Sequence, residues 1–139
     1  MSDGVRGLII SHSSLAEGMA AAVRKITGVG EEALSSLSNE GRGPDELLES
    51  IRGGCGTDAV ILFTDMPSGS CALAARKVVA QRPATALVSG VNLPILLEFV
   101  FHRDLPLPEL VDRLVESGRR GITAVCTEGT AHADHTAPR

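Results

Sequence analysis

The sequence predicts an α/β fold of the doubly wound kind, in which helices flank a mainly parallel sheet. Three short, almost continuous apolar runs, residues 5–10, 59–63 and 85–88, are rich in Val and Ile. Strands buried on both faces of a parallel sheet have this composition. Segments with apolar residues at helical spacing separate the runs, and such alternation implies right-handed crossovers. The 139 residues have the length of one domain.

Five helices are expected between and after these strands. The first begins at about Ser14, carries apolar residues at helical spacing, and stops at Gly28, a typical C-terminal glycine. The second opens at Pro44 with acidic residues in its first turn and ends at residues 53–54. Similar apolar stripes predict the other three, at residues 70–81, 94–102 and 107–117.

Two further strands complete the expected sheet, which then has a flavodoxin-like order. Residues 33–37 are polar, but a βαβαβ order needs a strand there. Residues 122–126 have β-branched side chains and follow the last helix, as an edge strand would. The domain thus spans residues 1–126. Residues 127–139 are small, polar and aperiodic, which predicts a disordered tail.

Composition excludes several functional classes. A net charge of −4, scattered Lys and Arg, and only three aromatic residues, all Phe, argue against binding to nucleic acid. The N-terminus has no signal-peptide pattern, and polar residues interrupt the most apolar window, residues 86–101. An odd number of cysteines without metal-ligand spacing predicts free thiols in a reducing compartment: Cys55, Cys71 and Cys126. We therefore expect a soluble, cytoplasmic protein.

A histidine lies where the first predicted strand gives way to the first helix. His12 follows residues 5–10, and the carboxyl ends of parallel strands form the crevice in which α/β folds bind ligands. The unpaired N–H groups of the helix that begins at about Ser14 would stabilise an anion there, such as a phosphoryl group. A polar surface histidine or a helix cap would occupy the same position, so position alone leaves these interpretations open.

Two other strand ends face the same crevice. Asp65 follows the third predicted strand and residues 90–94 follow the next one. Asp65 is also placed to cap the helix that begins at Ser70. A carboxylate that accepts a hydrogen bond from one ring N–H fixes the histidine tautomer and leaves the other nitrogen as a nucleophile. The pair therefore predicts attack by His12 on phosphorus, with Asp65 orienting the ring.

Hydroxyl groups near these strand ends could bind the phosphoryl oxygens, because positioning and hydrogen-bond donors dominate phosphoryl transfer. The candidates, besides two helix N-termini, are Ser13, Ser14, Ser68 and Ser70.

Other chemistries lack their motifs. The chain has no Gly-rich nucleotide loop, no dinucleotide fingerprint and no nucleophile elbow. A receiver domain phosphorylated on Asp65 would need an acidic pair for Mg²⁺ at the end of the first strand, which here reads Ser11-His12. Cys71 is interpreted as a packing residue. His132 and His135 in the tail lack further ligands. We expect neither a metal nor a cofactor.

Residues 5–126 resemble the enzyme IIA domain of the mannose-type sugar phosphotransferase system. Residues 7–28 are similar to that family's strand with a terminal phosphorylated histidine and the helix that follows. Asp65 with residues 68–70 resembles its Asp-x-x-Gly-Gly-Ser-Pro turn, and residues 90–96 resemble its Gly-Val-Asn-x-Pro-Met-Leu signature.

The resemblance implies a phosphotransferase that works through a phosphohistidine. His12 would accept a phosphoryl group from the phosphocarrier HPr and pass it to a IIB component during sugar uptake, with Asp65 orienting the ring. Gly69, Ser70 and their helix N-terminus would bind the phosphoryl oxygens.

The resemblance also implies contacts beyond the catalytic pair. Asn92 and Pro94 would belong to the loop that borders the site and meets partners. Members of the family are homodimers that exchange their last strand, which here would be residues 122–126. Contact with a membrane would arise only through a IIC or IID permease.

Some residues depart from that family's pattern. Ser68 and Cys71 replace its usual Gly and Pro around Ser70, and Ser13-Ser14 replaces a Gly-aromatic pair. The Ser-His-Ser-Ser run is similar to the IIA-like subunit of dihydroxyacetone kinase, whereas residues 90–94 favour the mannose branch. An orphan regulatory IIA protein, whose phosphorylation on His12 controls a protein partner, needs the same site and is a further alternative.

Overall fold

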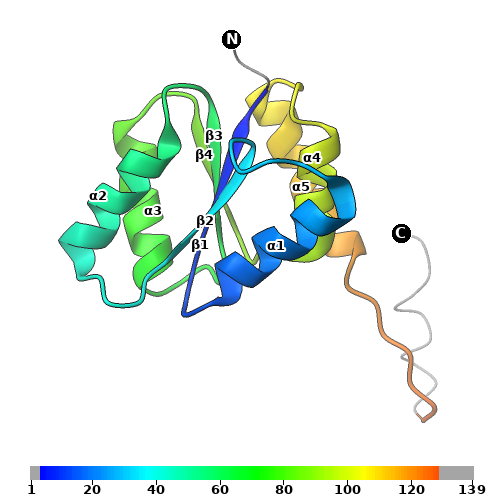
Figure 1. Cartoon of the computed structure of the whole chain (residues 1–139). Helices are drawn as coiled ribbons and strands as arrows, with labels where there is room; N and C mark the ends of the chain where they lie inside the picture. The colour runs from blue at the N-terminus through cyan, green and yellow to red at the C-terminus, as the bar shows by residue number, and fades with distance from the viewer. Residues whose placement is uncertain (1–3, 129–139) are drawn as a thin grey trace.

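Four parallel strands form the centre of the molecule in a computed structural model that describes residues 4–128 (Figure 1). The strands are β1 (Arg6–Ser11), β2 (Leu34–Ser38), β3 (Val60–Thr64) and β4 (Thr85–Ser89). Their order in the sheet is β2-β1-β3-β4, and all three neighbouring pairs are parallel. The predicted flavodoxin-like order is confirmed, including the polar strand β2.

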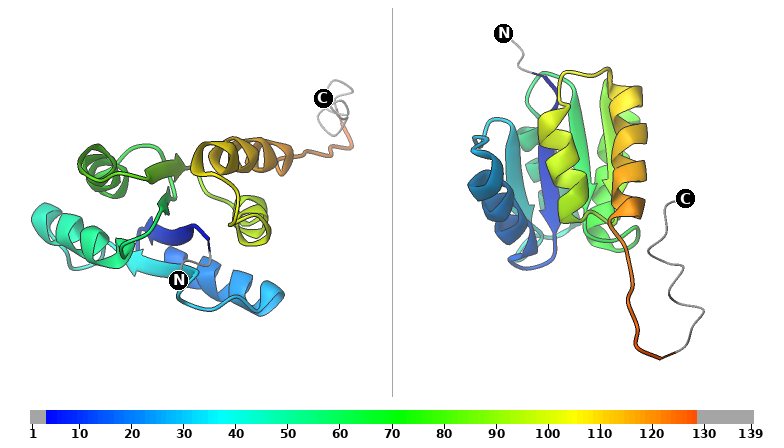
Figure 2. Two further views of the ribbon diagram at one scale, coloured as in Figure 1. Left: turned by 90° about the horizontal axis from the view of Figure 1, so that it is seen from above. Right: turned by 90° about the vertical axis from the view of Figure 1, so that its right-hand side faces the viewer.

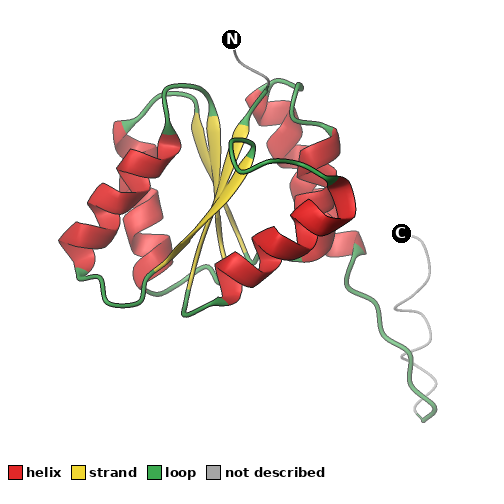
Figure 3. Cartoon of the chain, viewed as in Figure 1, coloured by secondary structure: helices red, strands yellow, loops and turns green. Residues whose placement is uncertain are grey.

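Five helices cover the two faces of this sheet, as a doubly wound fold requires (Figure 2, Figure 3). They are α1 (Leu15–Thr27), α2 (Pro44–Cys55), α3 (Ser70–Gln81), α4 (Leu93–Phe101) and α5 (Leu107–Arg120). The buried side chains of α2 and α3 pack on one face, and those of α1, α4 and α5 pack on the other. All five helices lie within about two residues of their predicted starts and within about three of their predicted ends, which is the usual uncertainty of such boundaries.

Phe99 of α4 packs against the central strands β1 and β3. Its ring is fully buried and meets Phe63 of β3 edge-on, with centroids 5.4 Å apart and ring planes at 78°. Gly7 of β1 makes room for it, because a Cβ at Gly7 would lie 2.8 Å from the Phe99 ring. Phe99 therefore sets the distance between α4 and β1, the strand that leads to His12.

Residues 122–126 form no strand within the single chain, and their exchange between subunits stays a prediction. The segment leaves α5 as an exposed, extended chain, with 74% of Ile122 and 89% of Val125 accessible to solvent (Figure 1). Its β-branched residues have strand propensity, but a strand forms only where a partner offers backbone groups to pair. Among the described residues, β4 forms a ladder only with β3, so this edge of the sheet is open.

Two further expectations concern the chain ends and membranes. Most of the tail predicted at residues 127–139 lies outside the described residues. Within residues 4–128, no helix is long and apolar enough to cross a bilayer.

Candidate functional site

His12 lies at the carboxyl end of β1, in the turn that leads into α1. The turn is tight: Ser13 adopts φ of 53°, and the buried Ser11 hydroxyl accepts a hydrogen bond from the Ala16 N–H at 2.6 Å. This bond anchors the start of α1 to the end of β1. The His12 side chain remains 45% exposed, so that the ring is accessible from solvent while its backbone is held.

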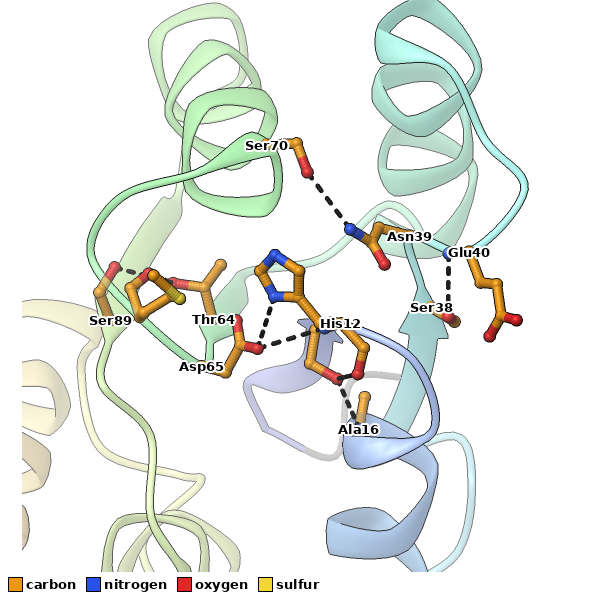
Figure 4. A network of polar contacts seen from close by, with 11 residues as sticks. His12, Ala16, Ser38, Asn39, Glu40, Thr64, Asp65, Ser70 and Ser89 are labelled. Atoms are coloured by element: carbon orange, nitrogen blue, oxygen red, sulfur yellow. Dashed lines mark hydrogen bonds and ion pairs between the residues drawn. The ribbon is translucent and has the colours of Figure 1, made fainter.

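Asp65 holds the His12 residue at two points (Figure 4). Its Oδ2 lies 2.8 Å from Nδ1 of the ring and also accepts a hydrogen bond from the His12 backbone N–H at 3.2 Å. β1 and β3 are neighbours in the sheet, which brings together two residues 53 positions apart in sequence. When Nδ1 carries the proton that Asp65 accepts, Nε2 has a free lone pair.

The charge of Asp65 is stabilised by this contact. Burial raises the pKa of the carboxyl, but the hydrogen bonds from the ring and backbone of His12 outweigh it, so that the pKa lies below its ordinary value. The second oxygen, Oδ1, is buried and has no hydrogen-bond partner among the described residues. Asp65 is therefore an anion whose Oδ2 accepts hydrogen bonds from His12 and whose Oδ1 accepts none.

Ser70 and Asn39 flank the other side of the ring. In Figure 4 the second ring nitrogen points away from Asp65, toward the part of the crevice where these two residues lie. The Asn39 amide donates to the Ser70 hydroxyl at 3.3 Å. Asn39, which is not among the predicted site residues, follows the polar strand β2, and its backbone N–H donates to the Ser11 carbonyl at 3.0 Å.

Of the other predicted phosphoryl-binding residues, Gly69 lies close to the His12 ring. Gly69 is the N-cap of α3 with φ of 96°, and a Cβ built there would lie 3.9 Å from Cε1 and Nε2 of His12. The α3 N-terminus is therefore close to the ring. Ser13, Ser14 and Ser68 are exposed, and the Ser14 side chain makes no capping bond to α1.

The Cys71 side chain is buried beside the same carboxylate. Burial raises the pKa of this thiol, and the negative charge of Asp65 raises it further. The thiol is thus protonated at neutral pH and is no reactive nucleophile by itself, in line with its interpretation as a packing residue.

Asn92 and Pro94 contact the end of α5. Asn92 caps α4 by accepting from the Ile95 N–H at 3.0 Å, and its amide donates to the Gly118 carbonyl at 3.2 Å. Pro94 lies against Gly121, where a Cβ would approach its ring to 2.7 Å. These contacts join α4 to α5, while a role in meeting partners stays a prediction.

Replacing Asn92 by Ala is expected to lower the free energy of unfolding by about 1–2 kcal/mol, because α4 loses its N-cap and the Gly118 carbonyl loses a donor. Urea unfolding followed by circular dichroism measures the change. Asn92→Asp keeps the oxygen that caps α4 but has no N–H for the Gly118 carbonyl, so it should recover the capping part of the loss alone. Equal stability of Asn92→Ala and the parent protein would contradict the capping role.

The part of the chain that contains this site matches a known protein family. The family model EIIA-man, described as the PTS system fructose IIA component, matches residues 7–115, which include His12 and Asp65. The chain belongs to the EIIA-man family. The family model covers both strands that bring the histidine and the carboxylate together, so the EIIA-man assignment rests on the domain that contains the site.

A curated relative of this EIIA-man chain matches over half of the chain. The mannose-specific EIIAB component of the PTS from Escherichia coli K12 is 35% identical over 71 residues, which are 50% of this chain and 22% of that protein. The match therefore spans about a fifth of the relative's length.

Solved structures support the EIIA fold over most of the chain. The phosphotransferase component EIIA from Streptococcus agalactiae superposes with a TM-score of 0.80 at 19% identity, covering 86% of this chain and 96% of that one. The mannose/sorbose specific IIA subunit from Enterococcus faecalis gives a TM-score of 0.78 at 19% identity, covering 91% and 98%.

Proposed function

We propose that this EIIA-man protein accepts a phosphoryl group from phospho-HPr on Nε2 of His12 and passes it to a IIB component during sugar uptake. The observation that carries the proposal is the 2.8 Å contact between Asp65 Oδ2 and Nδ1 of the ring. This contact leaves the lone pair of Nε2, the ring nitrogen that points toward Ser70 (Figure 4), available as the nucleophile. The proposal places the reaction in the cytoplasm, where free thiols such as those of this chain persist.

Transfer would proceed by in-line displacement at phosphorus. The Nε2 lone pair of His12 forms a new N–P bond while the N–P bond to the donor histidine breaks, and the electron pair returns to the donor ring. Nδ1 keeps its proton, and the positive charge that develops on the phosphorylated ring is stabilised by the Asp65 carboxylate. Ser70, the Asn39 amide and the α3 N-terminus supply donors to the phosphoryl oxygens. Passage to IIB is the reverse displacement.

Exposed apolar side chains near the strand ends support docking of a protein donor. These side chains lie at the first residues of α1 and α4, in the loop after β3 and in the first turn of α3, and all four places are at the carboxyl edge of the sheet. They are Leu15, Met66, Leu73 and Leu93. Apolar groups exposed around a functional centre are typical of surfaces that bind other proteins.

Intact mass after incubation with phosphoenolpyruvate, enzyme I and HPr tests the proposal. The parent protein should gain one acid-labile phosphoryl group, and His12→Ala should gain none. Adding the IIB component should then discharge the label, whereas a purely regulatory IIA protein would keep it. Label retained by His12→Ala, or no label on the parent protein with active HPr, would contradict the assignment.

A homodimer formed through residues 122–126 is also part of the proposal. The open edge of β4 provides a place for an added strand. The exposed Ile122 and Val125 supply a segment with the propensity to pair there.

Light scattering is expected to give twice the chain mass of 14.5 kDa for the parent protein. A variant with Ile122→Asp and Val125→Asp should be monomeric, because charges replace the apolar side chains of the paired segment. Thr127→Asp, just beyond the segment, serves as the matched control and should remain dimeric. A monomeric parent protein would exclude the exchange.

A further inference from the structure

Three metal-ligating side chains meet beside the proposed phosphorylation site. One ligand atom from each of His12, Asp65 and Cys71 lies within 4.8 Å of the others. They come from the end of β1, the end of β3 and the first turn of α3. The catalytic role proposed above uses His12 and Asp65 and leaves the Cys71 thiol without a task.

The carboxylate in this cluster has an oxygen to spare. Oδ1 of Asp65 is buried without a hydrogen-bond partner among the described residues, while Oδ2 accepts both bonds from His12. An orphaned anionic oxygen inside a protein is costly. A cation coordinated between Asp65, the imidazole and the thiolate would satisfy it.

The donor set selects the kind of cation. An imidazole nitrogen, a thiolate and a carboxylate suit Zn²⁺ and related transition-metal ions, whereas Mg²⁺ and Ca²⁺ require oxygen ligands. Ligands of a tetrahedral zinc lie about 3.3 to 3.8 Å apart, given bonds of about 2.0 to 2.3 Å. Separations of up to 4.8 Å need only small side-chain movements to close. His12, which is 45% exposed, provides the entry path and leaves room for a water molecule as fourth ligand.

We propose that His12, Asp65 and Cys71 bind one Zn²⁺ ion, and that the ion blocks phosphorylation of His12. As the metal binds, the Cys71 proton leaves to solvent and an Sγ–Zn bond forms. Zinc bound at Nε2 occupies the nucleophile directly. Zinc bound at Nδ1 moves the ring proton to Nε2, which removes the same lone pair. Zinc binding does not depend on the proposed function, whereas the inhibition of His12 phosphorylation by zinc rests on it.

Cobalt and zinc titrations of the full chain test the binding. His132, His135 and the exposed Cys126 are first replaced by Ala, so that they cannot bind metal adventitiously. One equivalent of Co²⁺ should then give a thiolate-to-cobalt charge-transfer band that one equivalent of Zn²⁺ removes. Cys71→Ala should abolish the band and weaken zinc binding by about 100-fold or more, since loss of an outer-shell partner alone costs about 10- to 100-fold.

Two matched variants keep the test decisive. Cys55→Ala removes another buried thiol, at the end of α2 and outside the cluster, and should leave the band unchanged. Cys71→Ser preserves the size of the side chain if Cys71→Ala folds poorly, and thermal melting establishes that each variant is folded. Absence of the charge-transfer band, or equal zinc affinity of the parent and the folded Cys71 variants, would overturn the proposal.

Phosphoryl transfer with and without zinc separates the two proposals. Without zinc, the Cys71→Ala variant should accept the phosphoryl group as the parent does. Added zinc should stop transfer to the parent and spare the variant, which also controls for effects of zinc on enzyme I and HPr. A parent that binds zinc and is never phosphorylated would refute only the proposed function, and equal inhibition of both proteins would refute the block.

Discussion

Replacing Asp65 by Asn is expected to slow phosphoryl transfer to His12 by about 10²- to 10⁴-fold. General acid–base groups contribute rate factors in this range, and the loss of a carboxylate that orients a catalytic histidine costs as much as the upper end of it. The amide can donate a hydrogen bond to Nδ1, which shifts the ring proton to Nε2 and removes the nucleophilic lone pair. It also carries no charge to stabilise the phosphorylated ring. Quenched-flow measurement of transfer from phospho-HPr gives the rate.

Asp58→Asn is the matched control for this experiment, because Asp58 lies just before β3, at the opposite edge of the sheet. It should transfer at the parent rate. An Asp65→Asn protein that reacts within about threefold of the parent would show that ring orientation by the carboxylate is dispensable. The proposal for Nε2 would then lose its main support.

Replacing Phe99 by Ala is expected to lower the free energy of unfolding by about 3–5 kcal/mol, the cost of emptying the volume of a buried aromatic ring. The ring is fully buried between Gly7 and Phe63. Such a loss is a large part of the total stability of about 5–15 kcal/mol of a domain. Chemical denaturation gives the value.

Phe101→Ala provides the control on the same helix. Its side chain is 67% exposed, so its loss should change stability by no more than about 0.5 kcal/mol. A small effect at Phe99 would mean that α4 can collapse onto Gly7 and refill the space. In that case Gly7 would not define the position of α4.

The sequence predicted the fold well where burial on both faces leaves a plain pattern. β3 is buried at all five positions and its apolar run marks it clearly. β2 was predicted from the βαβαβ order of elements, because its polar residues form no apolar run. A strand at the edge of the sheet can be polar. Residues 122–126 pair with no other described strand of their own chain, because strand propensity describes one segment and pairing requires a second one. A strand formed by these residues in a dimer stays a prediction.

The site was predictable in its centre and less so at its border. His12 and Asp65 follow apolar strands, whose ends are easily located, and both lie where the topology brings them together. Asn39 follows a strand without an apolar pattern, so nothing in the sequence pointed to its contact with Ser70. Asn92 was predicted from a motif, whereas its hydrogen bonds to α4 and α5 depend on tertiary contacts that a motif does not contain.

The proposed phosphorylation of His12 depends on correct pairing of β1 with β3. Ile10 lies opposite Thr64, and the next residues along each strand lead to His12 and Asp65. A slip of one residue between these strands would turn alternate side chains to the wrong face and misalign the two groups. Nascent, misfolded or partly unfolded chains would then lack an oriented imidazole. Under the proposed function, only properly assembled molecules would draw on the cell's phosphoenolpyruvate.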